Sequence, residues 1–168
     1  AIGEYILSEA KTNCPERCLV QLSCWNLSLW TIYFLFNINS NIFLFTIISM
    51  QFTVSIGKLM QDLFYYKHLS KQFYDLFCHY INLIIAICLI PSVKSLAIKQ
   101  LLFIYLLAIS YTVYYVIMAF VLSKCHLPPE PEFSPLESSG RVHIAYLFLF
   151  FIIISLLLNY IVSYIKYR

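Results

Sequence analysis

The chain has 168 residues, of which 61% are hydrophobic and 11% are charged. A soluble domain carries roughly 25% charged residues, so this composition excludes a free soluble globule. A mean hydropathy of +0.80 points the same way. With 3 Gly and 6 Pro, the chain is neither collagenous nor a disordered linker. We therefore predict a single integral membrane domain over residues 1–168, of the all-α class.

The apolar stretches between clusters of charged residues predict the number of membrane crossings. A spanning helix needs about 20 apolar residues, because it rises roughly 1.5 Å per residue across about 30 Å of hydrocarbon. The final stretch is the clearest, since the basic and aromatic residues 166–168 follow it as an interfacial anchor. We predict a polytopic bundle of five spans, at residues 19–36, 42–60, 76–93, 100–123 and 142–165.

Two interruptions decide this count. Asn37, Asn39, Ser40 and Asn41 fall in the middle of the first long uncharged stretch. They resemble a turn and would be costly in hydrocarbon, so we predict two crossings there. The alternative is four spans, with one long tilted helix that buries these residues against protein.

The second interruption is Pro91, which is followed by Lys94 and Lys99. Proline restricts the residue before it, and lysines extend their ammonium groups toward lipid headgroups. We therefore predict a tight turn here, with the third and fourth spans forming a hairpin.

Two segments outside the spans have their own patterns. Residues 1–12 place apolar side chains at helical spacing, which predicts a short amino-terminal helix lying in the membrane interface. Residues 127–135 contain four prolines, which predict an extended, solvated loop between the last two spans.

The charges outside the spans help to predict which face of the membrane holds the carboxyl terminus. In a five-span bundle, Lys94, Lys99, Lys166 and Arg168 fall on one side without an acidic residue. The longer segments of the other side hold the remaining 7 of the 11 basic residues, together with all 8 acids. Net charge and the number of basic residues favour opposite sides as the cytosolic or matrix face. The positive-inside rule, by which Lys and Arg mark that face, is most reliable for short connections. We therefore place the carboxyl terminus on the cytosolic or matrix face.

A polar stripe in the third span is the first candidate site. Asp75, His79 and Asn82 are separated by four and three residues, which places them on one helical face. Ionisable groups inside a membrane are functional hypotheses, and this face could relay protons or contact a lipid headgroup. The interpretation that we favour is simpler: Asp75 and His79 lie at the membrane surface, and Asn82 joins helices.

Deep hydroxyl and amide groups form a second set of candidates. Tyr111, Tyr114 and Tyr115 lie too far inside the fourth span for an interfacial belt, so their hydroxyls need partners from protein or from a bound polar ligand. Asn159 is the corresponding deep residue of the last span. A quinone or a lipid headgroup could supply the partners, although bonds between subunits are the commoner explanation. Tyr111 and Tyr115 join Asp75, His79 and Asn82 as weak candidates for headgroup contact.

Cysteine spacing allows one further site. In the five-span topology, Cys14, Cys18, Cys125 and His126 face the same compartment, so a disulfide or a zinc site is geometrically allowed. A lone C-x3-C pair is weak support for a metal, and unpaired thiols are the state that we favour. We predict no cofactor and no metal.

The function predicted from these features is structural. The sequence contains no GxSxG, no HExxH and no Gly-rich phosphate loop, and its dispersed basic residues make no nucleic-acid stripe. We expect a non-catalytic accessory or assembly subunit that packs against other membrane subunits and lipid, with the mitochondrial inner membrane slightly favoured over the endoplasmic reticulum. The alternatives are a membrane-embedded lipid-modifying enzyme and a small transporter or proton-pathway protein.

Overall fold

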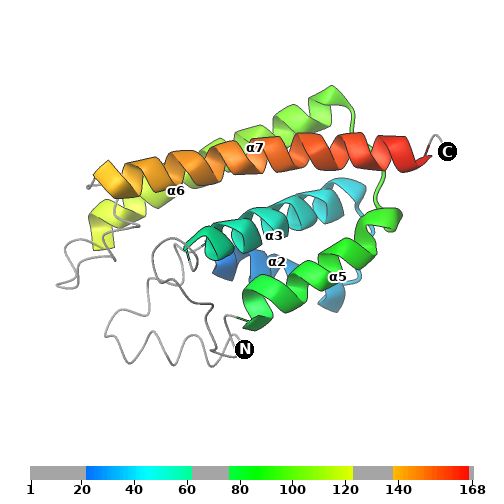
Figure 1. Ribbon diagram of the computed structural model, residues 1–168, viewed down its shortest axis with the longest axis horizontal. Helices are drawn as coiled ribbons and strands as arrows, with labels where there is room; N and C mark the ends of the chain where they lie inside the picture. The colour runs from blue at the N-terminus through cyan, green and yellow to red at the C-terminus, as the bar shows by residue number, and fades with distance from the viewer. Residues whose placement is uncertain (1–21, 62–75, 123–137, 167–168) are drawn as a thin grey trace.

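The computed structural model describes residues 22–61, 76–122 and 138–166, and every element in these ranges is helical (Figure 1). This confirms the all-α class for the described residues. The predicted interfacial helix at 1–12 and the Pro-rich loop at 127–135 lie outside them. In chain order the elements are α2 (Leu22–Leu35), α3 (Asn41–Gln61), the π-helix η3 (Leu76–Ile81), α5 (Asn82–Leu89), the 3-10 turn η4 (Ile90–Ser92), α6 (Ile98–Leu122) and α7 (Ser138–Lys166).

Three of these helices are long and apolar enough to cross a membrane. They are Asn41–Met60, Ile98–Ile117 and Phe148–Lys166, and they largely overlap the predicted second, fourth and fifth spans. Helices also occupy the predicted first and third positions, but the described parts of both are shorter. The 14 residues of α2 extend only about 21 Å, and His79–Ser92 is a short apolar helix. The structure thus supports three spans by length and leaves five as a prediction.

The predicted interruption between the first two spans is a turn. Asn37 adopts a left-handed backbone conformation with φ of 46°, which asparagine tolerates better than most residues. The Ile38 amide donates to the Tyr33 carbonyl at 3.2 Å. The Ser40 hydroxyl then accepts from the Phe43 amide at 3.4 Å and caps the start of α3. Two helices therefore replace the single long helix of the alternative interpretation.

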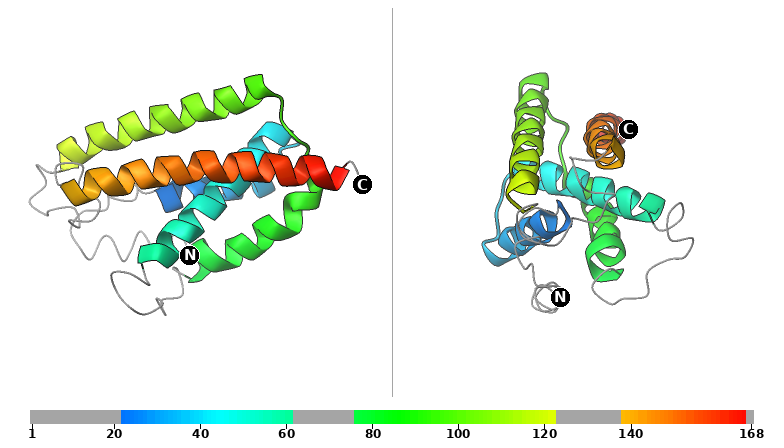
Figure 2. Two further views of the ribbon diagram at one scale, coloured as in Figure 1. Left: turned by 45° about the horizontal axis from the view of Figure 1, so that its top comes forward. Right: turned by 90° about the vertical axis from the view of Figure 1, so that its left-hand side faces the viewer.

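Helix α3 lies at the centre of the bundle. It packs against α2 on one side, against η3 and α5 on another, and against α7 on a third, whereas α6 packs chiefly on α7 (Figures 1 and 2). The chain does turn after Pro91, as predicted. However, residues 93–97 continue as an extended connection, and α5 and α6 pack on different neighbours, so the predicted hairpin is not a packed pair.

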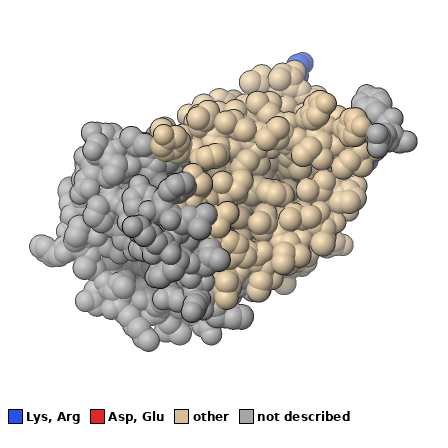
Figure 3. Space-filling view, viewed as in Figure 1, with Lys and Arg blue, Asp and Glu red and all other residues tan. Residues whose placement is uncertain are grey.

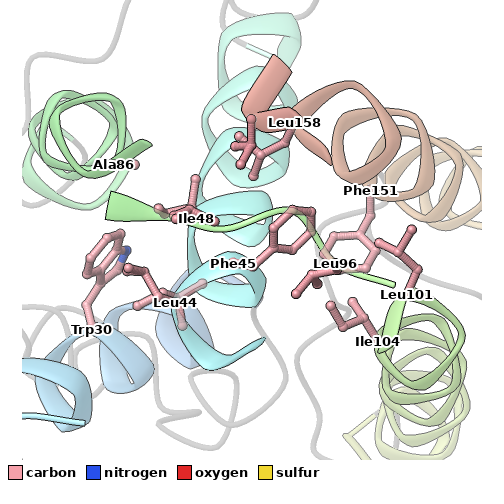
Figure 4. Close-up of a cluster of buried hydrophobic side chains, with 13 residues drawn as sticks. Trp30, Leu44, Phe45, Ile48, Ala86, Leu96, Leu101, Ile104, Phe151 and Leu158 are labelled. Carbon is pink, nitrogen blue, oxygen red and sulfur yellow. The ribbon is translucent and has the colours of Figure 1, made fainter. Parts of the chain in front are cut away.

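The apolar core follows from this central position. Phe45, Ile47 and Ile48 of α3 are completely buried, and Phe151 and Leu158 of α7 cover them from the other side (Figure 4). The core is completed by Trp30 of α2, Ala86 of α5, Leu96 of the extended connection, and Leu101 and Ile104 of α6. Six separate segments therefore contribute to one apolar core, in which α3 and α7 pack face to face.

The smallest of these core residues gives a test of the packing. Ala86 is completely buried where α5 meets α3. Ala86→Leu is expected to lower the free energy of unfolding by about 1.5 kcal/mol, because a close-packed interface has no room for three more carbons. Cys88→Leu is the matched control, since Cys88 is exposed on the same helix, and it should be near neutral. Equal effects in a detergent unfolding titration would contradict the placement of α5.

Candidate functional site

A buried hydrogen-bond network surrounds Gln51, in the middle of α3. The Gln51 Oε1 atom accepts from Asn26 Nδ2 at 2.5 Å and from Trp30 Nε1 at 3.1 Å, both on α2. The Gln51 Nε2 atom donates to Ser55 Oγ at 3.0 Å and to the His79 carbonyl at 3.4 Å. Gln51 and Asn26 are both almost completely buried. One neutral amide thus connects α2, α3 and η3.

The π-helix η3 supplies the backbone side of this network. A π-turn shifts the helical hydrogen-bond ladder by one residue, and such turns are frequent at functional sites. Here the His79 carbonyl accepts from two side chains of α3, because the Ser55 hydroxyl donates to it as well as Gln51 Nε2. Gln51 and Ser55 are one helical turn apart, so together they hold η3 against α3.

Two of the three residues in the predicted polar stripe of the third span lie in the described part of the chain. Asn82 is buried and His79 is half-buried, and both belong to the segment that packs on α3. Asp75 lies outside the described residues. Because η3 is wider than an α-helix, the regular α-helical spacing assumed in that prediction does not hold across Leu76–Ile81. A shared headgroup-binding face for the three residues stays a prediction.

Three buried polar atoms near this region keep unused hydrogen-bonding capacity. They are Asn26 Oδ1, Ser49 Oγ and Asn82 Nδ2, none of which has a hydrogen-bond partner. A buried polar atom without a partner costs about 1–3 kcal/mol.

The predicted tyrosines lie elsewhere, on α6 beside α2. The Trp25 ring of α2 makes edge-on contacts with Tyr111 and Tyr114, at centroid distances of 6.4 and 5.9 Å. Tyr115 lies 6.3 Å from Tyr111. Aromatic packing between α2 and α6 therefore accounts for much of this cluster. The described candidates for headgroup contact therefore fall into two groups. His79 and Asn82 belong to η3 and α5, which pack on α3, whereas Tyr111 and Tyr115 belong to α6, beside α2.

Two asparagines hold the extended connection between α5 and α6. Asn41 Nδ2 donates to the Lys94 carbonyl at 2.9 Å, and the Lys94 amide donates to Asn41 Oδ1 at 2.6 Å. The Leu96 amide donates to Asn159 Oδ1 at 2.7 Å, and Asn159 Nδ2 donates to the Leu96 carbonyl at 3.3 Å. Each side-chain amide carries a donor and an acceptor, so it satisfies both backbone groups of one residue.

This pair of contacts revises the interpretation of Asn159. The sequence predicted a bond to another subunit or to a ligand, but the side chain binds the backbone of its own chain. The backbone N–H and C=O groups of an extended segment near the membrane need such partners, because they form no hydrogen bonds within a helix. Asn41, predicted only as part of a turn, has the same role. No local pattern could indicate these contacts, since 53 and 63 residues separate the partners.

Comparisons with protein-family models, with curated proteins and with solved structures find no match for this chain. The function therefore has to be inferred from the site and the packing alone.

The candidate metal ligands Cys14, Cys18, Cys125 and His126 lie outside the described residues. Within residues 22–61, 76–122 and 138–166, no three His, Cys, Asp or Glu side chains group together as metal ligands would. The polar groups brought together there are mostly amides and hydroxyls, which exchange hydrogen bonds but carry no titratable proton near neutral pH. This chemistry is suited to joining helices.

Proposed function

We propose that the protein is a non-catalytic integral membrane subunit that packs against partner subunits and lipid in a larger membrane complex. The observation that carries this proposal is the contrast between two of its helices. Half of the α3 span is buried inside the bundle, but only 11% of the α6 span is. A helix with so little contact to its own chain leaves most of its surface to other molecules.

The exposed surface of α6 is apolar. Ser110 is exposed on this helix, but its hydroxyl donates to the Leu106 carbonyl of the preceding turn and needs no outside partner. Figure 3 shows that the described part of one face of the molecule is almost uncharged. The large exposed apolar residues of α6 are Ile98, Leu102, Phe103, Leu106, Leu107, Ile109, Val113 and Ile117. Such a surface suits lipid tails and an apolar partner helix equally well.

The polar groups also favour a packing role over catalysis or transport. A lipid-modifying enzyme or a proton pathway needs several ionisable side chains at one place. In the described residues, the buried polar groups Asn26, Gln51 and Ser55 are instead bonded to other parts of the same chain. These bonds stabilise helix contacts within the membrane.

The membrane topology belongs to the same proposal. We infer that the chain crosses five times, because the helices at the predicted first and third positions alternate in direction with the three long ones (Figure 2). Assemblies of the mitochondrial inner membrane and of the endoplasmic reticulum both recruit small polytopic subunits of this kind, and we favour the mitochondrial inner membrane slightly.

Photo-crosslinking from α6 tests the proposal. A photoreactive residue at Leu106, which is 62% exposed, should give a discrete crosslinked band with one membrane protein. The same residue at Ile104, which is completely buried on that helix, is the matched control and should give none. Ser110→Phe should abolish the band from Leu106, because fluid lipid accommodates added bulk but a packed protein interface does not.

The result that would contradict the proposal is equally specific. If Leu106 crosslinks only to lipid, and the chain purifies in mild detergent as a monodisperse monomer, α6 faces lipid and the protein acts alone.

A further inference from the structure

One end of the bundle collects basic side chains from three separate segments. Figures 1 and 2 place the end of α5, the start of α6 and the end of α7 together at this end. Lys94 lies in the extended connection, Lys99 in the first turn of α6 and Lys166 in the last turn of α7, and all three are exposed. We call this surface, formed by the three lysines, the basic end.

Within the described part of the chain, no acidic side chain neutralises the charge of the basic end, because ranges 22–61, 76–122 and 138–166 contain no acidic residue. The helix dipoles add only about half a negative charge there, because α2, α5 and α7 end where α3 and α6 begin. The three ammonium groups therefore determine the sign of the potential at this end.

The aromatic residues of α7 indicate the depth of the basic end in the membrane. Tyr160 is 70% exposed and Tyr164 is 52% exposed, in the last two turns before Lys166. Exposed tyrosines followed by a lysine mark the level of the lipid headgroups. The lysines of the basic end thus lie at headgroup level, where phosphate groups are.

The two asparagine contacts keep this arrangement in place. Asn41 holds the backbone of Lys94 to the start of α3, and Asn159 holds Leu96 to α7, about two turns before Lys166. Lys94 and Lys99 are therefore positioned relative to Lys166 by side-chain hydrogen bonds.

We propose that the basic end binds the phosphate-bearing headgroups of anionic phospholipids. Its lysines come from a short connection and two helix ends at the same end of the bundle, which matches headgroups arranged around a protein. Lysine carries a flexible stem and a compact charge, which suits mobile headgroups. The proposal concerns lipid at one end of the molecule and does not depend on the protein partner of α6.

The test measures how strongly the full chain selects anionic over zwitterionic lipid. The chain is reconstituted in vesicles that contain either spin-labelled phosphatidylglycerol or spin-labelled phosphatidylcholine, and the immobilised fraction of each gives their relative association constant. A lysine near an anionic surface contributes about five-fold in affinity. We expect several-fold selectivity for phosphatidylglycerol, which falls by about half or more in the variant Lys94→Gln/Lys99→Gln/Lys166→Gln.

Lys58→Gln is the matched control, because Lys58 lies in the last turn of α3, at the other end of the bundle. It should keep the full selectivity. Raising the salt from 0.15 to 1 M should reduce the selectivity of the unmodified chain, since the Debye length falls from about 8 to about 3 Å.

Three outcomes would overturn the proposal. The first is an unmodified chain without selectivity, and the second is a triple variant that keeps it. The third is displacement by millimolar inorganic phosphate, which would identify a soluble anion as the ligand. Normal selectivity in the triple variant together with loss of a crosslinked protein would assign the lysines to an acidic partner instead.

Discussion

Gln51→Ala is expected to lower the free energy of unfolding by about 3 kcal/mol. The substitution removes four hydrogen bonds, to Asn26, Trp30, Ser55 and the His79 carbonyl. Hydrogen bonds between membrane helices are worth about 0.6 kcal/mol on average and at most about 1.7 kcal/mol each. The lost bonds and the space left by a buried side chain together account for the expected value. Titration with a denaturing detergent, followed by circular dichroism, measures it.

Thr53→Val is the matched control for this effect. Thr53 is also completely buried on α3, but its hydroxyl donates only to the Ser49 carbonyl of its own helix. The substitution keeps the shape and removes a bond within one helix, so it should cost less than about 1 kcal/mol. If the two variants unfold alike, Gln51 does not join α2 and η3 to α3.

Asn159→Ala is expected to cost about 2 kcal/mol and to release the extended connection. Leu96 is 6% exposed, so loss of the Asn159 amide leaves one backbone donor and one backbone acceptor buried without partners. Amide hydrogen exchange of residues 93–97 should become faster, while exchange in the middle of α3 stays unchanged.

Asn41→Ala makes the corresponding change at the exposed contact of the same connection. Its bonds to Lys94 are exposed, so water or lipid headgroups can replace them, and the cost should stay below about 1 kcal/mol. Equal costs for the two asparagines, or unchanged exchange at Leu96 in Asn159→Ala, would show that the connection is held by apolar packing alone.

The helix positions could be predicted because they depend on local properties of the chain. The uncharged length of 142–165 predicts the helix that the structure describes as Ser138–Lys166. The turn near Asn37 and the interruption after Pro91 follow from residues that disfavour helix where they stand.

The candidate site was predicted only in part. The His79 backbone is bonded to α3, but the spacing argument assumed a regular α-helix and could not anticipate the π-turn of η3. The bond between Tyr105 and Ser155, at 3.2 Å, likewise joins α6 and α7 across 50 residues of sequence. The sequence shows that such polar groups need partners, but it does not identify them.

The sequence by itself determined the apolar composition, the all-helical class and the places where helices are interrupted, because hydropathy and turn propensity act over a few neighbouring residues. Only the tertiary structure decided that α3 is central, that α6 is peripheral and that Gln51 and Asn159 bond within the chain. Helices in lipid are nearly equivalent in apolar surface, so which ones pack together depends on shape and on distant polar pairs. These pairs are defined only when residues far apart in sequence, such as Leu96 and Asn159, meet in space.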